Sequence, residues 1–178
     1  MSVAAFIREN THPIIKEWQT FAEGLEPAAK SKSPRSLRNH IAQTLAFIAD
    51  DIESPQSDSE QITKSHGEKR QNSTESPAAI HASLRLDGGF SMDQMVSEYR
   101  ALRASIVRLW TEGRTEVKVG ELSELTRFNE SVDQQLTESI GFYTKTLDRS
   151  RSMFLGFWAT IYEIHSVLQR CRLSLRCT

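Results

Sequence analysis

The sequence contains few of the residues that interrupt helices or cross-link a fold. Its 178 residues include 5 prolines, 8 glycines and 2 cysteines. Cys171 and Cys177 both lie near the C-terminus, where they cannot provide a disulfide framework for the whole chain. Two thiols at this spacing also supply too few ligands for a metal site. We therefore expect a fold without disulfides, bound metal or other cofactor.

Long apolar runs and an excess of one charge are also missing. No apolar run reaches the ~20 residues that span a bilayer, and Met1–Glu9 lacks the basic start of a signal peptide. The 22 Lys and Arg and 23 Asp and Glu side chains leave a formal net charge of -1. This balance gives no reason to expect binding to nucleic acid or to a membrane. The sequence predicts a cytoplasmic protein.

Strand signals are scarce, whereas apolar residues recur at three- and four-residue spacing along most of the chain. This periodicity is typical of amphipathic helices, and the predicted fold class is all-α, a helical bundle. Pro13 should kink or split the first helix near His12. Residues 54–77 are polar and predict a loop with one short helical turn. Helices are expected at about residues 3–25, 34–51, 77–86, 91–113 and from 120 onward.

The last predicted helix starts near Gly120 and continues past Phe154, which is longer than a single small domain needs. Its apolar residues alternate at three- and four-residue spacing, a pattern typical of a coiled-coil seam. We therefore expect a homodimer through this helix. The predicted seam consists of Val132, Leu136, Ile140, Tyr143 and Leu147.

Two groups of polar residues are candidates for a signal-sensing contact between helices. His81 and Arg85 are four residues apart and share one helix face. The second group lies in a predicted helix whose apolar periodicity indicates burial. The alternative interpretation is that both groups form solvated helix faces with weak ion pairs. The second group is Glu98, Tyr99, Arg100 and Arg103.

Several phrases of the sequence resemble one family. They are Ser36–Ile41, Ala49–Ile52, Ile80–Arg85, Val96–Arg103 and Leu125–Glu130. These phrases are similar to the N-terminal domain shared by cytoplasmic sensor histidine kinases and stressosome co-antagonist (RsbRD-type) proteins. The resemblance covers about Phe6 to Gly156 and implies a helical sensory domain, in its stressosome relatives like a globin without haem. It implies a sensory domain at 1–117 and a long output helix of the same domain at 118–156, leading toward a kinase dimerisation helix.

The end of the chain resembles an interrupted kinase motif. Asp148–Gly156 is similar to the approach to the phosphoacceptor helix of histidine kinases, in which I-L-G-H-D-L-R-N-P-L follows. Here Phe157–Ser166 follows instead. Suitable codons for these ten residues, with one A inserted after the Gly156 codon, read I-L-G-H-D-L-R-N-P-L. We therefore interpret residues 157–178 as a frameshifted tail, which should be poorly ordered or only loosely helical.

The interrupted motif predicts that this chain is catalytically inactive. His165 is followed by Ser166-Val167-Leu168, whereas a phosphoacceptor histidine is followed by an acidic residue, then a basic residue and a proline. The sequence also has no glycine-rich ATP lid or P-loop. The resemblance implies that a response regulator is the partner of the full-length kinase.

Two alternative functions are also compatible with the sequence. A haem sensor of globin type needs a proximal histidine that faces an apolar pocket, and only His40 or His81 could serve. A scaffold module of stressosome type would instead bind a partner protein. A Soret band would identify the first alternative, and a pull-down would identify the second.

The frameshift interpretation makes a prediction about the gene. Inserting one base after the Gly156 codon should open a frame that reads I-L-G-H-D-L-R-N-P-L and continues into a kinase core. Nucleotide sequencing across this codon is the measurement. An immediate stop codon in the shifted frame would show that the interpretation is wrong.

Overall fold

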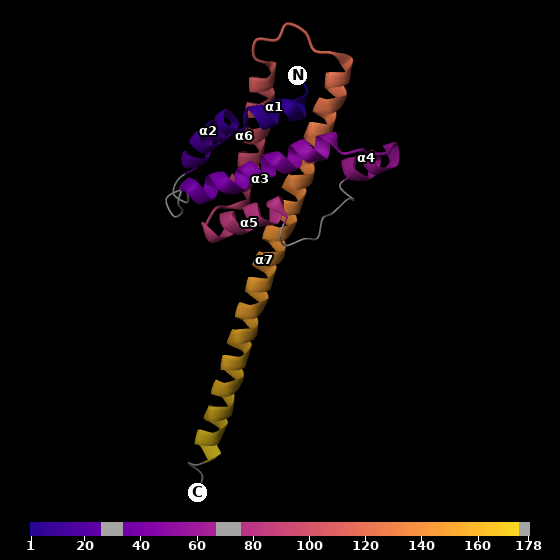
Figure 1. The fold of residues 1–178 in the computed structure, drawn as a ribbon. Coiled ribbons are helices and arrows are strands. Elements are labelled where there is room, and N and C mark those ends of the chain that lie inside the picture. Colours follow the sequence, from indigo (N-terminus) through magenta and orange to yellow (C-terminus); the bar gives the residue numbers. More distant parts are fainter. Residues whose placement is uncertain (26–33, 67–75, 175–178) are drawn as a thin grey trace. The chain divides into compact units, whose positions relative to one another are not determined.

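The computed structural model describes residues 1–25, 34–66 and 76–174. These residues form seven helices and no strand, so the predicted all-α fold is confirmed (Figure 1). The predicted long C-terminal helix is also confirmed. None of the described helices is long and apolar enough to cross a membrane. The helices are α1 (Val3–Glu9), α2 (Thr11–Glu23), α3 (Pro34–Glu53), α4 (Asp58–Ser65), α5 (Pro77–Asp87), α6 (Met92–Thr111) and α7 (Val119–Ser174).

Local sequence accounts for where several helices begin. The hydroxyl groups of Ser57, Ser76 and Ser91 each accept a hydrogen bond from the backbone N–H three residues later, which satisfies a donor that the helix itself leaves unpaired. The predicted break in the first helix lies at Asn10, between α1 and α2. Pro13 then falls in the first turn of α2, where its missing N–H has little effect.

The chain divides into two compact units, Met1–Tyr143 and Thr144–Thr178. In the first unit, α6 and the first part of α7 run side by side in opposite directions, and α3 lies across them (Figure 1). Helix α1 packs on α3, α2 packs on α6 and α3, and α5 packs on α3. We call this first unit the bundle. The predicted loop at 54–77 contains α4, and its residues 67–75 lie outside the described part of the chain.

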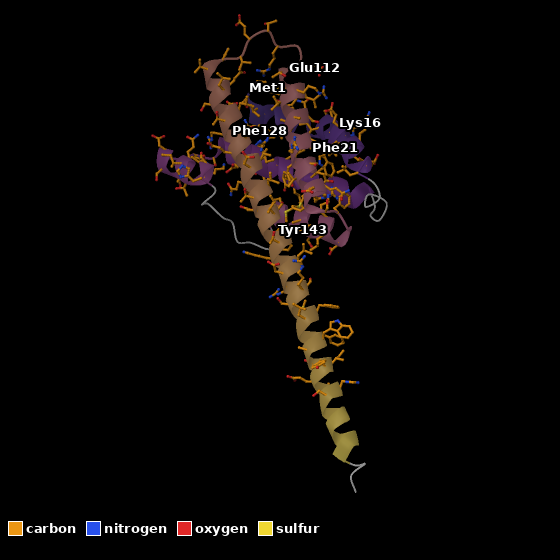
Figure 2. All side chains as sticks on the ribbon, turned by 180° about the vertical axis from the view of Figure 1, so that it is seen from behind. Met1, Lys16, Phe21, Glu112, Phe128 and Tyr143 are labelled. Carbon is orange, nitrogen blue, oxygen red and sulfur yellow. The ribbon has the colours of Figure 1, made fainter. Side chains whose placement is uncertain are left out.

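The core of the bundle is apolar and draws on almost every helix. Ile14, Leu45, Leu102 and Ile106 are completely buried. Phe128 of α7 is also completely buried, and Tyr143 is 7% exposed at the end of the unit (Figure 2). The first part of α7 is therefore an integral part of the bundle core.

The second unit consists of the rest of α7. The helix continues without interruption through Gly156 to Ser174. Residues 157–174, predicted to be poorly ordered or only loosely helical, are therefore helical. Every residue from Asp148 to His165 is exposed. Residues 175–178 lie outside the described part of the chain.

Substitution of a buried and of an exposed phenylalanine tests whether α7 is part of the bundle core. Phe128→Ala should lower the free energy of unfolding by about 3–5 kcal/mol, because it leaves a cavity in a packed interior. Phe21 is 38% exposed on α2 (Figure 2), so Phe21→Ala should cost less than half as much. Urea denaturation of both variants measures the difference. Equal losses would show that α7 does not complete this core.

Candidate functional site

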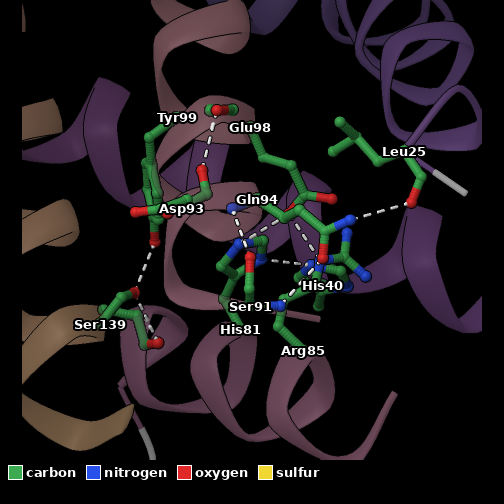
Figure 3. A network of polar contacts seen from close by, with 12 residues as sticks. Leu25, His40, His81, Arg85, Ser91, Asp93, Gln94, Glu98, Tyr99 and Ser139 are labelled. Carbon is green, nitrogen blue, oxygen red and sulfur yellow. Dashed lines mark hydrogen bonds and ion pairs between the residues drawn. The ribbon is translucent and has the colours of Figure 1, made fainter. Parts of the chain in front are cut away.

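The bundle contains a buried group of polar and aromatic side chains that we call the buried cluster. It consists of His40 from α3, His81 and Arg85 from α5, and Glu98 and Tyr99 from α6 (Figure 3). Each is between 0% and 4% exposed. Such complete burial of ionisable side chains is uncommon in proteins unless the groups are paired.

The local fold explains why these residues meet. His81 and Arg85 lie one turn apart on the same face of α5. A tight turn joins α5 to α6, and Gly89 adopts a positive φ of 74° in it, a conformation that glycine accepts without strain. The backbone N–H of Phe90 donates to the carbonyl oxygen of Arg85 at 3.0 Å. This turn folds α6 back, so that Glu98 reaches Arg85.

Hydrogen bonds and ion pairs connect the cluster in a chain. Nε2 of His40 lies 2.8 Å from Nδ1 of His81, and Nε2 of His81 lies 3.2 Å from Oε2 of Glu98. Nε of Arg85 donates to the same carboxylate oxygen at 2.5 Å. Nε2 of His81 is close enough to Glu98 for an ion pair, but the geometry of this contact is not that of a hydrogen bond. Arg85 is therefore the main partner of the carboxylate. We assign the proton of His81 to Nε2, which leaves Nδ1 to accept from His40.

The charges of the cluster are only partly satisfied by hydrogen bonds. The guanidinium carbon of Arg85 lies 5.3 Å from the ring centre of Trp18 and 4.7 Å from that of Phe90, which provides cation–π contacts. Nη1 and Nη2 of Arg85, Oε1 of Glu98 and Nε1 of Trp18 have no hydrogen-bond partner although they are buried. Each such group carries a desolvation cost.

The cluster also contacts α7 through hydroxyl groups. The hydroxyl oxygens of Tyr99 and Ser139 are 2.9 Å apart, and the Ser139 hydroxyl donates to the carbonyl oxygen of Ala78 at 2.9 Å. Tyr99 is therefore the donor to Ser139. Burial raises the pKa of Tyr99 far above its ordinary value, so its proton stays in this contact.

The structure brings together four of the six predicted polar residues, namely His81, Arg85, Glu98 and Tyr99. Arg100 is exposed and does not join them. Arg103 pairs with Asp133 of α7 near the surface. The fifth member, His40, was not among the predicted polar residues, and the sequence suggests it only as a haem ligand. Its place beside Ile41 on the apolar face of α3 is the signal in the sequence for its burial.

The residues of the predicted dimer seam have two different environments. Val132 and Tyr143 are buried in the bundle, and the Tyr143 hydroxyl donates to the carbonyl oxygen of Phe90 at 2.8 Å. Leu136, Ile140 and Leu147 are partly exposed. In this conformation Val132 and Tyr143 cannot contact a partner subunit.

The two candidate haem ligands point at each other. Their 2.8 Å contact uses Nδ1 of His81 and Nε2 of His40, and the other nitrogen of His81 faces Glu98. In this arrangement, Nε2 of His40 and Nδ1 of His81 are each engaged with the other histidine. Among the described residues, no group of three or more His, Cys, Asp or Glu side chains could hold a metal ion.

Comparisons with known proteins give no match for this chain. No protein-family model matches it, and neither a search of curated proteins nor one of solved structures finds a similar protein. The resemblance to sensor histidine kinases and the globin-like arrangement therefore stay predictions.

The buried cluster predicts a pH dependence of stability. Burial lowers the pKa of His81 below its ordinary value of 6.5, although Glu98 acts in the opposite direction. As the pH falls below 6.5, the unfolded chain takes up a proton that folded His81 does not, so the free energy of unfolding decreases. Urea midpoints measured between pH 8 and pH 5.5 should fall for the unmutated protein.

Two variants identify His81 as the source of this dependence. His81→Gln should flatten the fall of the urea midpoint, whatever its effect on stability at pH 8. His12 is exposed on α2, so His12→Gln should keep the dependence of the unmutated protein. An equal slope in all three proteins would show that His81 does not cause it.

Proposed function

We propose that this chain is the signal-input region of a two-component sensor histidine kinase, and that the buried cluster is its sensing element. One observation carries the proposal. Three of the phrases that resemble the kinase family, Ser36–Ile41, Ile80–Arg85 and Val96–Arg103, supply all five residues of the cluster. The parts of the sequence that carry the resemblance are thus the parts that meet in the interior.

The energetics of the cluster favour a role in signalling over a role in stability. A buried ion pair often contributes less to stability than apolar side chains of similar volume. Here Arg85 and Glu98 also leave polar atoms without partners. An arrangement that is costly and incompletely bonded can have a competing arrangement of similar free energy, which is what a ligand or signal shifts.

Helix α7 provides a route from the cluster to an output. Ser139 joins Tyr99 to α7, and α7 continues as one helix beyond the bundle. A change at Tyr99 would alter a contact that α7 makes within the bundle. In the proposed kinase, this helix would lead to the dimerisation and phosphoacceptor helices, and a response regulator would receive the phosphoryl group.

A chimeric kinase tests this proposal. Residues 1–156 are joined to the phosphoacceptor and ATP-binding domains of a cytoplasmic histidine kinase, and autophosphorylation with labelled ATP is measured. Glu98→Gln should change the rate by roughly fivefold or more, the low end of ordinary coupling free energies. Ser139→Ala, which removes the contact with Tyr99 but leaves the ion pair, should change it in the same direction.

The control variant is Asp93→Asn, because Asp93 is an exposed carboxylate on the same helix as Glu98. Its autophosphorylation should equal that of the unmutated chimera. Circular dichroism establishes that each variant is folded. If folded Glu98→Gln and Ser139→Ala chimeras both phosphorylate at the unmutated rate, the cluster is not a sensing element. Retention of stressosome proteins in a pull-down would then favour the scaffold alternative.

A further inference from the structure

The second unit carries an apolar surface that the proposed function does not use. Eight large apolar side chains between Met153 and Ile164 are 38% to 76% exposed. We call them the tail surface. Phe154 and Phe157 each make an edge-on contact with Trp158, with ring centres 6.0 Å and 6.1 Å apart. The described residues of the chain leave this surface uncovered.

The tail surface occupies one side of the helix. At 3.6 residues per turn its side chains fall within an arc of roughly 200°. Phe154 and Ile161, which are seven residues apart, lie at the centre of this arc, and Leu155 and Tyr162 lie at one edge. The opposite side carries small or polar residues, namely Ser152, Gly156, Ala159 and Glu163.

The size of the tail surface matches what a stable interface buries. Its four aromatic side chains are 52% to 76% exposed. Because an aromatic side chain presents about 150–250 Å², these four alone leave on the order of 500 Å² uncovered. The four aliphatic side chains bring the total toward the roughly 800 Å² per partner of a standard interface. A monomer rarely exposes a continuous patch of this size.

The pattern of residues favours another copy of this helix over a lipid surface. Helices that lie in a membrane interface carry Lys and Arg on their polar face, whereas the polar side here carries Glu163 and small residues. The spacing of Phe154, Phe157, Ile161 and Ile164 alternates three, four and three residues. This is the spacing at which two helices of the same sequence interlock.

We propose that the tail surface is covered by the tail surface of a second copy of this chain. Phe154, Phe157, Ile161 and Ile164 form the centre of the interface. The inference goes beyond the proposed function and does not depend on it. The proposed contact between copies lies C-terminal to the predicted dimer seam. Two residues of that seam, Val132 and Tyr143, lie in the core of the bundle.

Light scattering of the full chain at tens of micromolar tests the proposal. The unmutated protein should have twice the 20.2 kDa mass of one chain. The double variant Phe154→Glu with Ile161→Glu places charge at the centre of the interface and should have the mass of a single chain. The control is Leu155→Glu with Tyr162→Glu, which adds the same charge at the same spacing on the edge of the surface, where the carboxylates stay in contact with water, and should weaken the dimer much less.

Three outcomes would overturn the proposal. These are a monomeric unmutated protein, equal dissociation of both double variants, and a monomer that sediments with vesicles of phosphatidylcholine and phosphatidylglycerol. The last outcome would assign the surface to lipid. All four substitutions lie outside the bundle, so its thermal unfolding midpoint serves as the check on folding. The chimeric kinase contains this chain only up to Gly156 and therefore lacks Phe157, Ile161 and Ile164, so the two experiments can fail separately.

Discussion

The ion pair between Arg85 and Glu98 is the interaction on which the rest of the bundle depends. Both side chains are 0% exposed, and removal of either would leave an unpaired charge in the interior, at a cost of about 3–5 kcal/mol. The neighbouring helices must therefore all be in place to satisfy the two charges in the interior. Trp18 covers the guanidinium group from α2, and His81 connects the carboxylate to His40 of α3. Four helices thus meet at a single polar point within an apolar core.

One buried face of helix α7 within the bundle is polar. Ser131, Gln135 and Ser139 lie four residues apart on one face and are all completely buried. Ser139 is fully bonded, whereas the hydroxyl of Ser131 and both amide atoms of Gln135 have no hydrogen-bond partner. An apolar face would hold α7 more strongly. The polar face instead makes its position depend on specific contacts, mainly those of Ser139 with Tyr99 and Tyr143 with Phe90.

Sequence periodicity predicted the helices well because the 3.6-residue repeat and serine caps are local properties of the chain. Ser57, Ser76 and Ser91 cap the starts of α4, α5 and α6. Periodicity shows which side of a helix is buried but not which helix covers it. For this reason the sequence does not connect His40 with His81, and it places Arg100 next to Glu98 although Arg100 is exposed. The spacing of Val132 and Tyr143 is likewise the same for a coiled-coil seam and for a core within one chain.

The contact between the two histidines links the protonation of His81 to the tautomer of His40. In the neutral state, Nδ1 of His81 accepts from Nε2 of His40 across 2.8 Å. A proton added to His81 would place a second donor at Nδ1, so the contact would survive only if His40 moved its own proton to the other ring nitrogen. Proton uptake on α5 would therefore require a change on α3, while the added charge would strengthen the contact with Glu98 on α6. Coupling between distant sites needs an element of this kind, with distinct states that both sites can bias.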